Sequence, residues 1–159
     1  MKKITMFLIL VFVLVSLTAF DMTKKSDIEV TGVDITIMEQ SRILRYDFTL
    51  KNNGKKVIGE GQDYPGHHGI YLNLAVRPNE KLESLMEMES TKSHKKMAFR
   101  GGGGEGSIQP GKEGSFSLEY QIKMKKDVDF EAVSESALDA TLIVLDGWKV
   151  IAEIPLSQE

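Results

Sequence analysis

Apolar and polar residues alternate along several short stretches of the chain, a pattern typical of strands that bury one face. The clearest alternation runs through residues 42–50, whose apolar face consists of Leu44, Tyr46, Phe48 and Leu50. The same period predicts further strands at residues 28–38, 70–76, 95–100, 115–122, 141–145 and 148–156, and a short returning strand that begins at residue 57. Seven or eight short strands without long helices predict an all-β fold, namely an antiparallel β-sandwich of two sheets.

Glycine, proline and asparagine mark the places where the expected strands bend or end. In residues 28–38 the apolar phase changes at Thr31-Gly32, which predicts a β-bulge. Residues 52–54 (Asn-Asn-Gly) tolerate the positive φ of a tight turn, so we expect the chain to fold back there as a hairpin. Residues 110–111 (Pro-Gly) predict a turn before the next long strand.

The last two expected strands form a hairpin. Residues 146–147 (Asp-Gly) are a favoured two-residue turn, which makes Trp148 the first residue of the final strand. There Trp148 shares a phase with Val150, Ile154 and Leu156. We therefore expect Trp148 to lie in the core. Its expected partners are Phe48, Phe116 and Tyr120.

Two segments have helical rather than strand spacing. Residues 80–90 fit either a short helix capped by Asn79 or a strand through Met86 and Met88, and the pattern leaves both open. Residues 129–138 predict a short helix, which we expect to cross from one sheet to the other.

The N-terminus has the order of a secretory signal. Lys2 and Lys3 precede ten consecutive apolar residues, 6–15, and small and polar residues follow before Asp21. The apolar stretch of residues 4–20 is near the shortest that spans a bilayer, so cleavage is favoured over retention, and either outcome places the rest of the chain outside the cytoplasm. We divide the chain into a signal peptide or uncleaved membrane anchor (1–20), a polar leader (21–27) and a β-sandwich domain (28–159).

Composition and charge narrow the function classes. After residue 19 the chain has 18 basic and 23 acidic residues, so it lacks the basic face expected of a nucleic-acid-binding protein. The same excess of acidic residues gives no attraction to anionic lipid headgroups. We therefore expect contact with the membrane only through the N-terminal segment, if it is not cleaved. Cysteine is absent, which excludes disulfides, thiolate metal sites and a cysteine nucleophile.

Turn chemistry gives the chain a likeness to a known class of domain. Residues 48–55 (Phe-Thr-Leu-Lys-Asn-Asn-Gly-Lys) end one strand, and residues 108–113 (Ile-Gln-Pro-Gly-Lys-Glu) lead into Phe116-Ser117-Leu118. In these features the chain resembles the immunoglobulin-like β-sandwich accessory domains of exported Gram-positive bacterial proteins. The resemblance covers residues 28–156 in outline and implies an immunoglobulin-like topology. It carries no functional residue over to this sequence.

One long loop holds the residues with the most chemistry. Asp63, Tyr64, His67 and His68 lie among the glycines of residues 59–69, which would let a ligand approach the backbone closely. We take these four residues as the candidate partner-binding site. The imidazoles could also bind zinc or copper, although neighbouring side chains on an extended chain point to opposite sides, and a solvated turn is the simpler alternative.

Methionine extends the metal hypothesis. His94 is the third histidine of the chain, after His67 and His68. Met86 and Met88 precede His94, and Met97 follows it. Thioether and imidazole together suit copper(I), in a way that faintly resembles exported copper chaperones. Methionine is equally a filler of cores.

No residue pattern points to catalysis. The glycines of residues 101–106 lack the Gly-Lys-Ser/Thr of a phosphate-binding loop, and we expect them to form a flexible connection between strands. There is no Gly-x-Ser-x-Gly motif of a hydrolase. The sequence therefore favours a non-catalytic binding module of the cell envelope, whose partner is a protein or another envelope component. The alternative is an extracytoplasmic copper- or zinc-binding protein that uses His67, His68 and His94.

Overall fold

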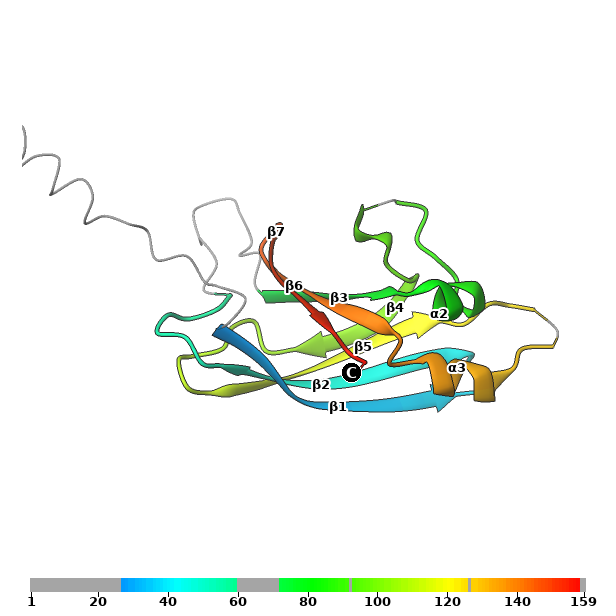
Figure 1. The fold of residues 1–159 in the computed structure, drawn as a ribbon, viewed down its shortest axis with the longest axis horizontal. Coiled ribbons are helices and arrows are strands. Elements are labelled where there is room, and N and C mark those ends of the chain that lie inside the picture. Colours follow the sequence, from blue (N-terminus) through cyan, green and yellow to red (C-terminus); the bar gives the residue numbers. More distant parts are fainter. Residues whose placement is uncertain (1–26, 60–71, 92, 126, 158–159) are drawn as a thin grey trace, which may run out of the picture.

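The computed structural model describes residues 27–59, 72–91, 93–125 and 127–157, which form two antiparallel sheets packed as a sandwich (Figure 1). One sheet has the strand order β1-β2-β5-β4 and the other has β3-β6-β7. The strands are β1 (Ile28–Met38), β2 (Ile43–Asn52), β3 (Leu72–Pro78), β4 (Phe99–Gly104), β5 (Glu113–Gln121), β6 (Ala140–Asp146) and β7 (Lys149–Pro155). The expected antiparallel β-sandwich is thereby confirmed, with seven strands in the described ranges.

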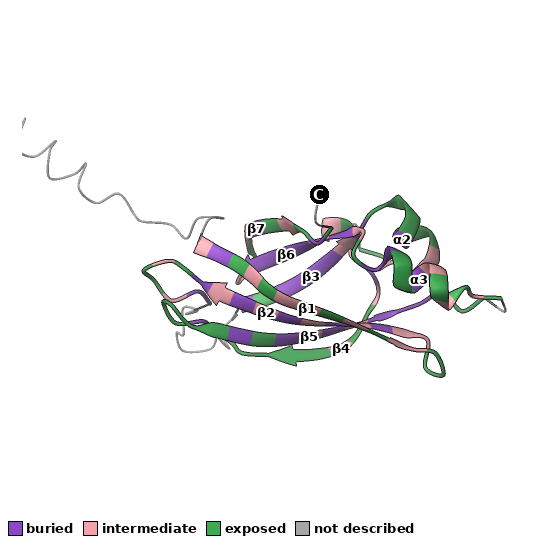
Figure 2. Cartoon of the chain, turned by 60° about the horizontal axis from the view of Figure 1, so that its bottom comes forward, coloured by how far each residue is buried: buried purple, intermediate pink, exposed green. Residues whose placement is uncertain are grey.

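The core consists of the alternating positions that the sequence predicted. Leu44, Tyr46, Phe48 and Leu50 of β2 are at most 1% exposed (Figure 2). The smaller sheet is buried on both faces along β6, where residues 142–145 are all buried. One face of β6 joins the main core, while the other packs with β3 and β7 in a small second cluster. That cluster consists of Ala75, Ile143, Leu145 and Val150.

The predicted bulge in β1 is present. The register of β1 against β2 shifts between Val30 and Gly32, so that Thr31 is the additional residue. Without this shift, Val33 and the aliphatic residues after it would face away from the core, because a one-residue slip reverses the faces of a strand.

The short helices connect the two sheets. They are α2 (Glu80–Leu85), the 3-10 turn η2 (Ser93–Lys95) and α3 (Phe130–Ser136). As predicted, α3 leads from β5 in one sheet to β6 in the other, and the side chain of Asp129 caps it by accepting from the Ala132 amide at 2.9 Å. Asn79 precedes α2, but its side chain donates to Asp139 instead of capping the helix, so that part of the prediction is wrong.

The two alternatives for residues 80–90 both occur, one after the other. After α2 ends, Met86 and Met88 are extended and form isolated bridges with Ile122 and Met97. Met86 and Met97 are fully buried in the core cluster, as expected of core-filling methionines.

The loop after β2 is not the predicted hairpin. Asn52 is buried, and its side-chain nitrogen donates to the carbonyl oxygens of Lys56 at 2.7 Å and Ile108 at 2.9 Å. Its side-chain oxygen accepts from the Gly54 amide at 2.9 Å. The prediction is wrong because the hydrogen bonds of the Asn52 side chain determine the shape of this loop. The loop leads to Ile58, which forms a bridge with Ile108 instead of pairing back onto β2.

The glycine run is a strand rather than the expected flexible connection. Residues 101–104 belong to β4 and pair with β5 along its edge. A Cβ atom on Gly102 would lie 2.3 Å from the carbonyl oxygen of Ser117, and one on Gly104 would lie 2.3 Å from the ring of Phe116. Glycine is therefore needed for the close approach of β4 to β5.

The turn between β6 and β7 begins one residue later than predicted. Asp146 pairs with Lys149, which leaves Gly147 and Trp148 as the two turn residues. Gly147 has φ 62°, as the first central residue of a type II′ turn requires. Trp148 is 83% exposed, so the expectation that it packs in the core is wrong.

Candidate functional site

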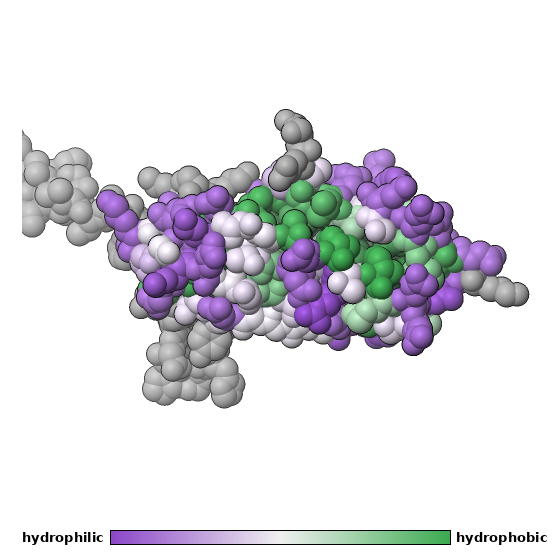
Figure 3. All heavy atoms as spheres, turned by 90° about the horizontal axis from the view of Figure 1, so that it is seen from below, coloured by the Kyte–Doolittle hydropathy of each residue, from purple (hydrophilic) through white to green (hydrophobic). Residues whose placement is uncertain are grey.

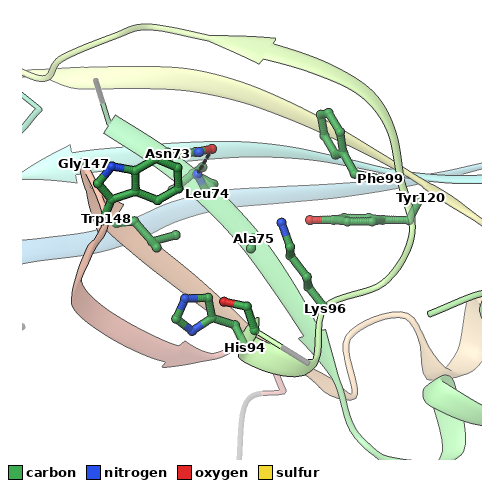
Figure 4. A pocket seen from close by; sticks show the side chains of 11 residues that line it. Asn73, Leu74, Ala75, His94, Lys96, Phe99, Tyr120, Gly147 and Trp148 are labelled. Atoms are coloured by element: carbon green, nitrogen blue, oxygen red, sulfur yellow. Dashed lines mark hydrogen bonds between the residues drawn. The ribbon is translucent and has the colours of Figure 1, made fainter. Parts of the chain in front are cut away.

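A pocket of about 210 Å³ lies between β3, the β6–β7 turn and the segment that leads into β4 (Figure 4). Its walls combine aromatic and polar side chains. The six that matter below are Asn73, His94, Lys96, Phe99, Tyr120 and Trp148. In Figure 4 the indole of Trp148 and the side chain of Asn73 lie at one end, and Phe99 and Tyr120 lie at the other.

Trp148 projects from the end of a tight turn. The two-residue connection between β6 and β7 holds the indole outside the sandwich, and the ladder that begins at Asp146 and Lys149 fixes the turn. A covered tryptophan buries up to about 250 Å² of surface, so the exposed indole does not contribute the large stabilisation that its burial would give. The turn thus presents a large apolar side chain on a short, well-paired support.

His94 lies on a looped-out segment that forms the floor of the pocket. The segment is closed at its base by the bridge between Met88 and Met97 and by the ion pair of Lys96 with Glu89 at 3.3 Å. His94 has φ 59° and Lys95 has φ 47°, a left-handed conformation that non-glycine residues seldom adopt. Such backbone strain persists only where the surrounding structure holds it, and it is found often at binding sites.

Phe99 and Tyr120 form the opposite wall. Their ring centroids are 6.1 Å apart in an edge-to-face arrangement, and Phe99 remains 50% exposed. The hydroxyl of Tyr120 accepts a hydrogen bond from the Val76 amide at 2.9 Å, which ties β5 to the edge of β3 across the core. Burial raises the pKa of Tyr120 above its usual range, so the phenol is neutral at physiological pH.

The backbone of β3 beside the pocket has its edge amides occupied. The amide of Leu72 donates to the Gly106 carbonyl at 2.9 Å, and that of Leu74 donates to the Asn73 side chain at 2.9 Å. Val76 donates to Tyr120, as described above. The pocket offers aromatic faces together with amine, imidazole and amide groups from its side chains.

The structure includes only part of the site that the sequence predicted. Asp63, Tyr64, His67 and His68 lie outside the described residues. His94 lines the pocket, whereas Met86 and Met97 point into the core. Within the described ranges, no three His, Asp or Glu side chains are grouped so that they could hold one metal ion. Metal binding by the three histidines stays a prediction, which metal analysis of the untagged protein tests.

Sequence reasoning missed Trp148, Phe99, Lys96 and Asn73 as members of a site. A signal for Trp148 was present, because Gly147 suits the first central position of a type II′ turn as well as the second position of an Asp-Gly turn. Phe99 and Lys96 share a pocket with Asn73 only because the two sheets pack against each other, for which the sequence has no local signal.

Comparison of the chain with protein-family models, curated proteins and solved structures finds no match. The structure therefore supports a sandwich of two antiparallel sheets and no particular family. In the ranges that the structure describes, no helix has the length and apolar character needed to cross a membrane.

Proposed function

We propose that the protein is an exported, non-catalytic binding module of the cell envelope, an immunoglobulin-like domain that holds a partner protein at the Trp148 pocket. The observation that carries this proposal is the 83% exposure of Trp148 on a tight turn at the rim of a pocket. Export itself rests on the order of charged, apolar and small residues at the N-terminus.

The chemistry of the rim supports a protein partner. Tryptophan is enriched among the few residues that dominate protein interfaces, where it fills a pocket on the partner while polar groups around it exclude water. His94, Lys96 and Asn73 supply polar groups in the same pocket as the indole. If a partner covered about 150 Å² of the indole, the burial would contribute on the order of 4 kcal/mol at about 25 cal/mol per Å².

The test is a pull-down from intact cell envelopes with the full-length chain tagged at its C-terminus. Trp148→Ala is expected to weaken capture of the partner about tenfold or more, while stability changes by less than about 0.5 kcal/mol because the side chain is exposed. Met124→Ala is the matched control, since Met124 is 71% exposed and is not among the residues that line the pocket. Equal capture by the parent and both variants would remove the pocket from the binding surface.

A further inference from the structure

The sandwich has a second exposed surface, between the edge strands β1 and β7. A groove lined by both strands runs there, from Val30 and Val33 on one side to Ile154 on the other. Figure 3, which views the molecule from below, shows apolar side chains gathered along this region. These partly buried aliphatic residues pack against the core. They are Val30, Val33, Ile35, Ile37, Ile151 and Ile154.

In the part of the chain that the structure describes, three of the four sheet edges are protected against pairing with another strand. The edge amides of β3 are occupied, as described above. β4 has a bulge at Arg100, and β7 carries Lys149, a bulge and Pro155. Charged residues, proline and bulges are the usual means by which proteins prevent unwanted pairing at an edge.

β1 is the least protected edge. After its bulge at Thr31, the seven residues from Gly32 to Met38 pair regularly with β2, include no proline, lysine or arginine, and carry Asp34 as their single charged residue. This half of the strand is long enough to support a full added strand, since strands of five or six residues are the most common.

The outward backbone groups of β1 can be assigned residue by residue. Asn52 of β2 directs both of its backbone groups toward the β5 side, donating to Lys112 and accepting from Gly111. Because hydrogen-bonding direction alternates along a strand, the odd-numbered residues of β2 face β1. Their partners in β1 include Asp34 and Thr36. The backbone groups of Val33, Ile35 and Ile37 therefore point outward, away from the sheet.

We propose that the edge of β1 from Gly32 to Met38 takes an extended segment of a partner protein as an eighth strand. Addition of a strand to an exposed edge is an established mode of peptide recognition, in which backbone bonds give affinity and alternate side chains give specificity. The added segment places aliphatic side chains on its inner face, where they extend the apolar row of Val33, Ile35 and Ile37.

The outer face requires a basic residue in the added segment. Asp34 lies directly opposite Asp47 in β2, and Arg45 is bound to Asp47 at 2.7 Å and to Glu119 at 3.3 Å. Like charges directly opposite one another destabilise a sheet, so a lysine or arginine beside Asp34 relieves this repulsion. A second copy of the chain does not meet the requirement, because β1 contains Glu29 and Asp34 and no basic residue.

The test uses a synthetic peptide, acetyl-Val-Lys-Val-Thr-Val-Lys-Val-amide, and the full-length chain. Calorimetry is expected to show binding, and hydrogen exchange is expected to show slower exchange of the Val33, Ile35 and Ile37 amides. A peptide with glutamate in place of lysine should bind about tenfold more weakly. No slowing at these amides, or equal affinity for the two peptides, overturns the proposal.

Two substitutions at one position separate backbone pairing from side-chain contact. Ile35→Pro removes an amide that faces outward and should abolish peptide binding, whereas Ile35→Ala keeps the amide and should weaken binding by about threefold at most. Circular dichroism establishes that both variants fold. If Ile35→Pro fails to fold, Asp34→Lys replaces it, with a predicted tenfold loss of affinity for the lysine peptide.

A concentration-dependent dimer that Ile35→Pro or Asp34→Lys dissociates would instead make a second copy the occupant and overturn the proposal. Trp148→Ala should bind the peptide like the parent, which keeps this outcome separate from the Trp148 pocket.

Discussion

At the scale of single residues, two buried tyrosines hold the sandwich together. The Tyr46 hydroxyl donates to the carbonyl of Ala137 at 2.7 Å, and that of Tyr120 accepts from the amide of Val76 at 2.9 Å. Alternation along β2 and β5 predicted that both rings are buried, because the period of a strand determines the face of every side chain. Their hydrogen bonds could not be predicted, since each connects groups more than forty positions apart.

The two hydroxyls make stability depend on pH in the alkaline range. Burial raises the pKa of Tyr46 and Tyr120 in the folded chain above the ordinary value of 10.0. Above about pH 10 the unfolded chain loses these protons while the folded chain keeps them, so the free energy of unfolding should be constant below that pH and fall above it. Urea unfolding at a series of pH values from about 8 to about 11 measures this, because that range extends to both sides of the ordinary tyrosine pKa.

Tyr120→Phe is the matching substitution. It leaves the Val76 amide buried without its acceptor, so we expect a loss of about 1–3 kcal/mol at pH 8. The fall in stability above pH 10 should become shallower in this variant because one of the two shifted groups is gone. An unchanged alkaline slope would show that Tyr120 does not contribute to it.

At the scale of elements, the sequence predicted the strands that have a periodic apolar face and failed where side chains carry no such period. β1, β2 and β5 lie where alternation placed them, and the bulge at Gly32 follows from a change of phase. The glycine part of β4 was missed because four consecutive glycines have no face to bury, whereas Phe99 and Arg100 fall in the strand expected at residues 95–100. Trp148 was misplaced because the turn begins one residue later than expected, which makes Trp148 a turn residue instead of the first residue of β7.

Two neighbouring glycines of β4 test the account of this strand. Gly102→Ala should destabilise the protein by about 1–3 kcal/mol, because its Cβ atom would lie 2.3 Å from the backbone oxygen of Ser117, which cannot move freely. Gly103→Ala is the control in the same strand. Its Cβ atom has no heavy atom within 4 Å, so the change should stay within about 0.5 kcal/mol. Thermal unfolding that ranks the two alike would contradict the close packing of β4 on β5.

At the scale of the whole molecule, the sandwich carries two separate surfaces. The pocket with Trp148 lies beside the edge of β3, and the groove lies between the edge strands β1 and β7. Neither could be recognised in the sequence, because each is assembled from strands that come together only in the folded chain. The fold class was predictable from local periods, whereas the sites depend on topology.

Export is the prediction that concerns the entire chain. The apolar run at residues 6–15 after Lys2 and Lys3 should direct the protein out of the cytoplasm. Fractionation of cells that produce the full-length chain is expected to place it in the envelope or the medium. Recovery in the cytosol with Met1 intact would be inconsistent with export.

The central claim is that Trp148 is free in the isolated protein and covered in the complex. The chain contains one tryptophan, so 5-fluorotryptophan labels this position alone. We predict one fluorine resonance whose shift changes between H₂O and D₂O in the free protein, as for an indole in contact with solvent. Adding solubilised envelope from cells without the label should move this resonance and remove the solvent effect. A resonance insensitive to D₂O in the free protein, or one unchanged by the envelope, would contradict the account.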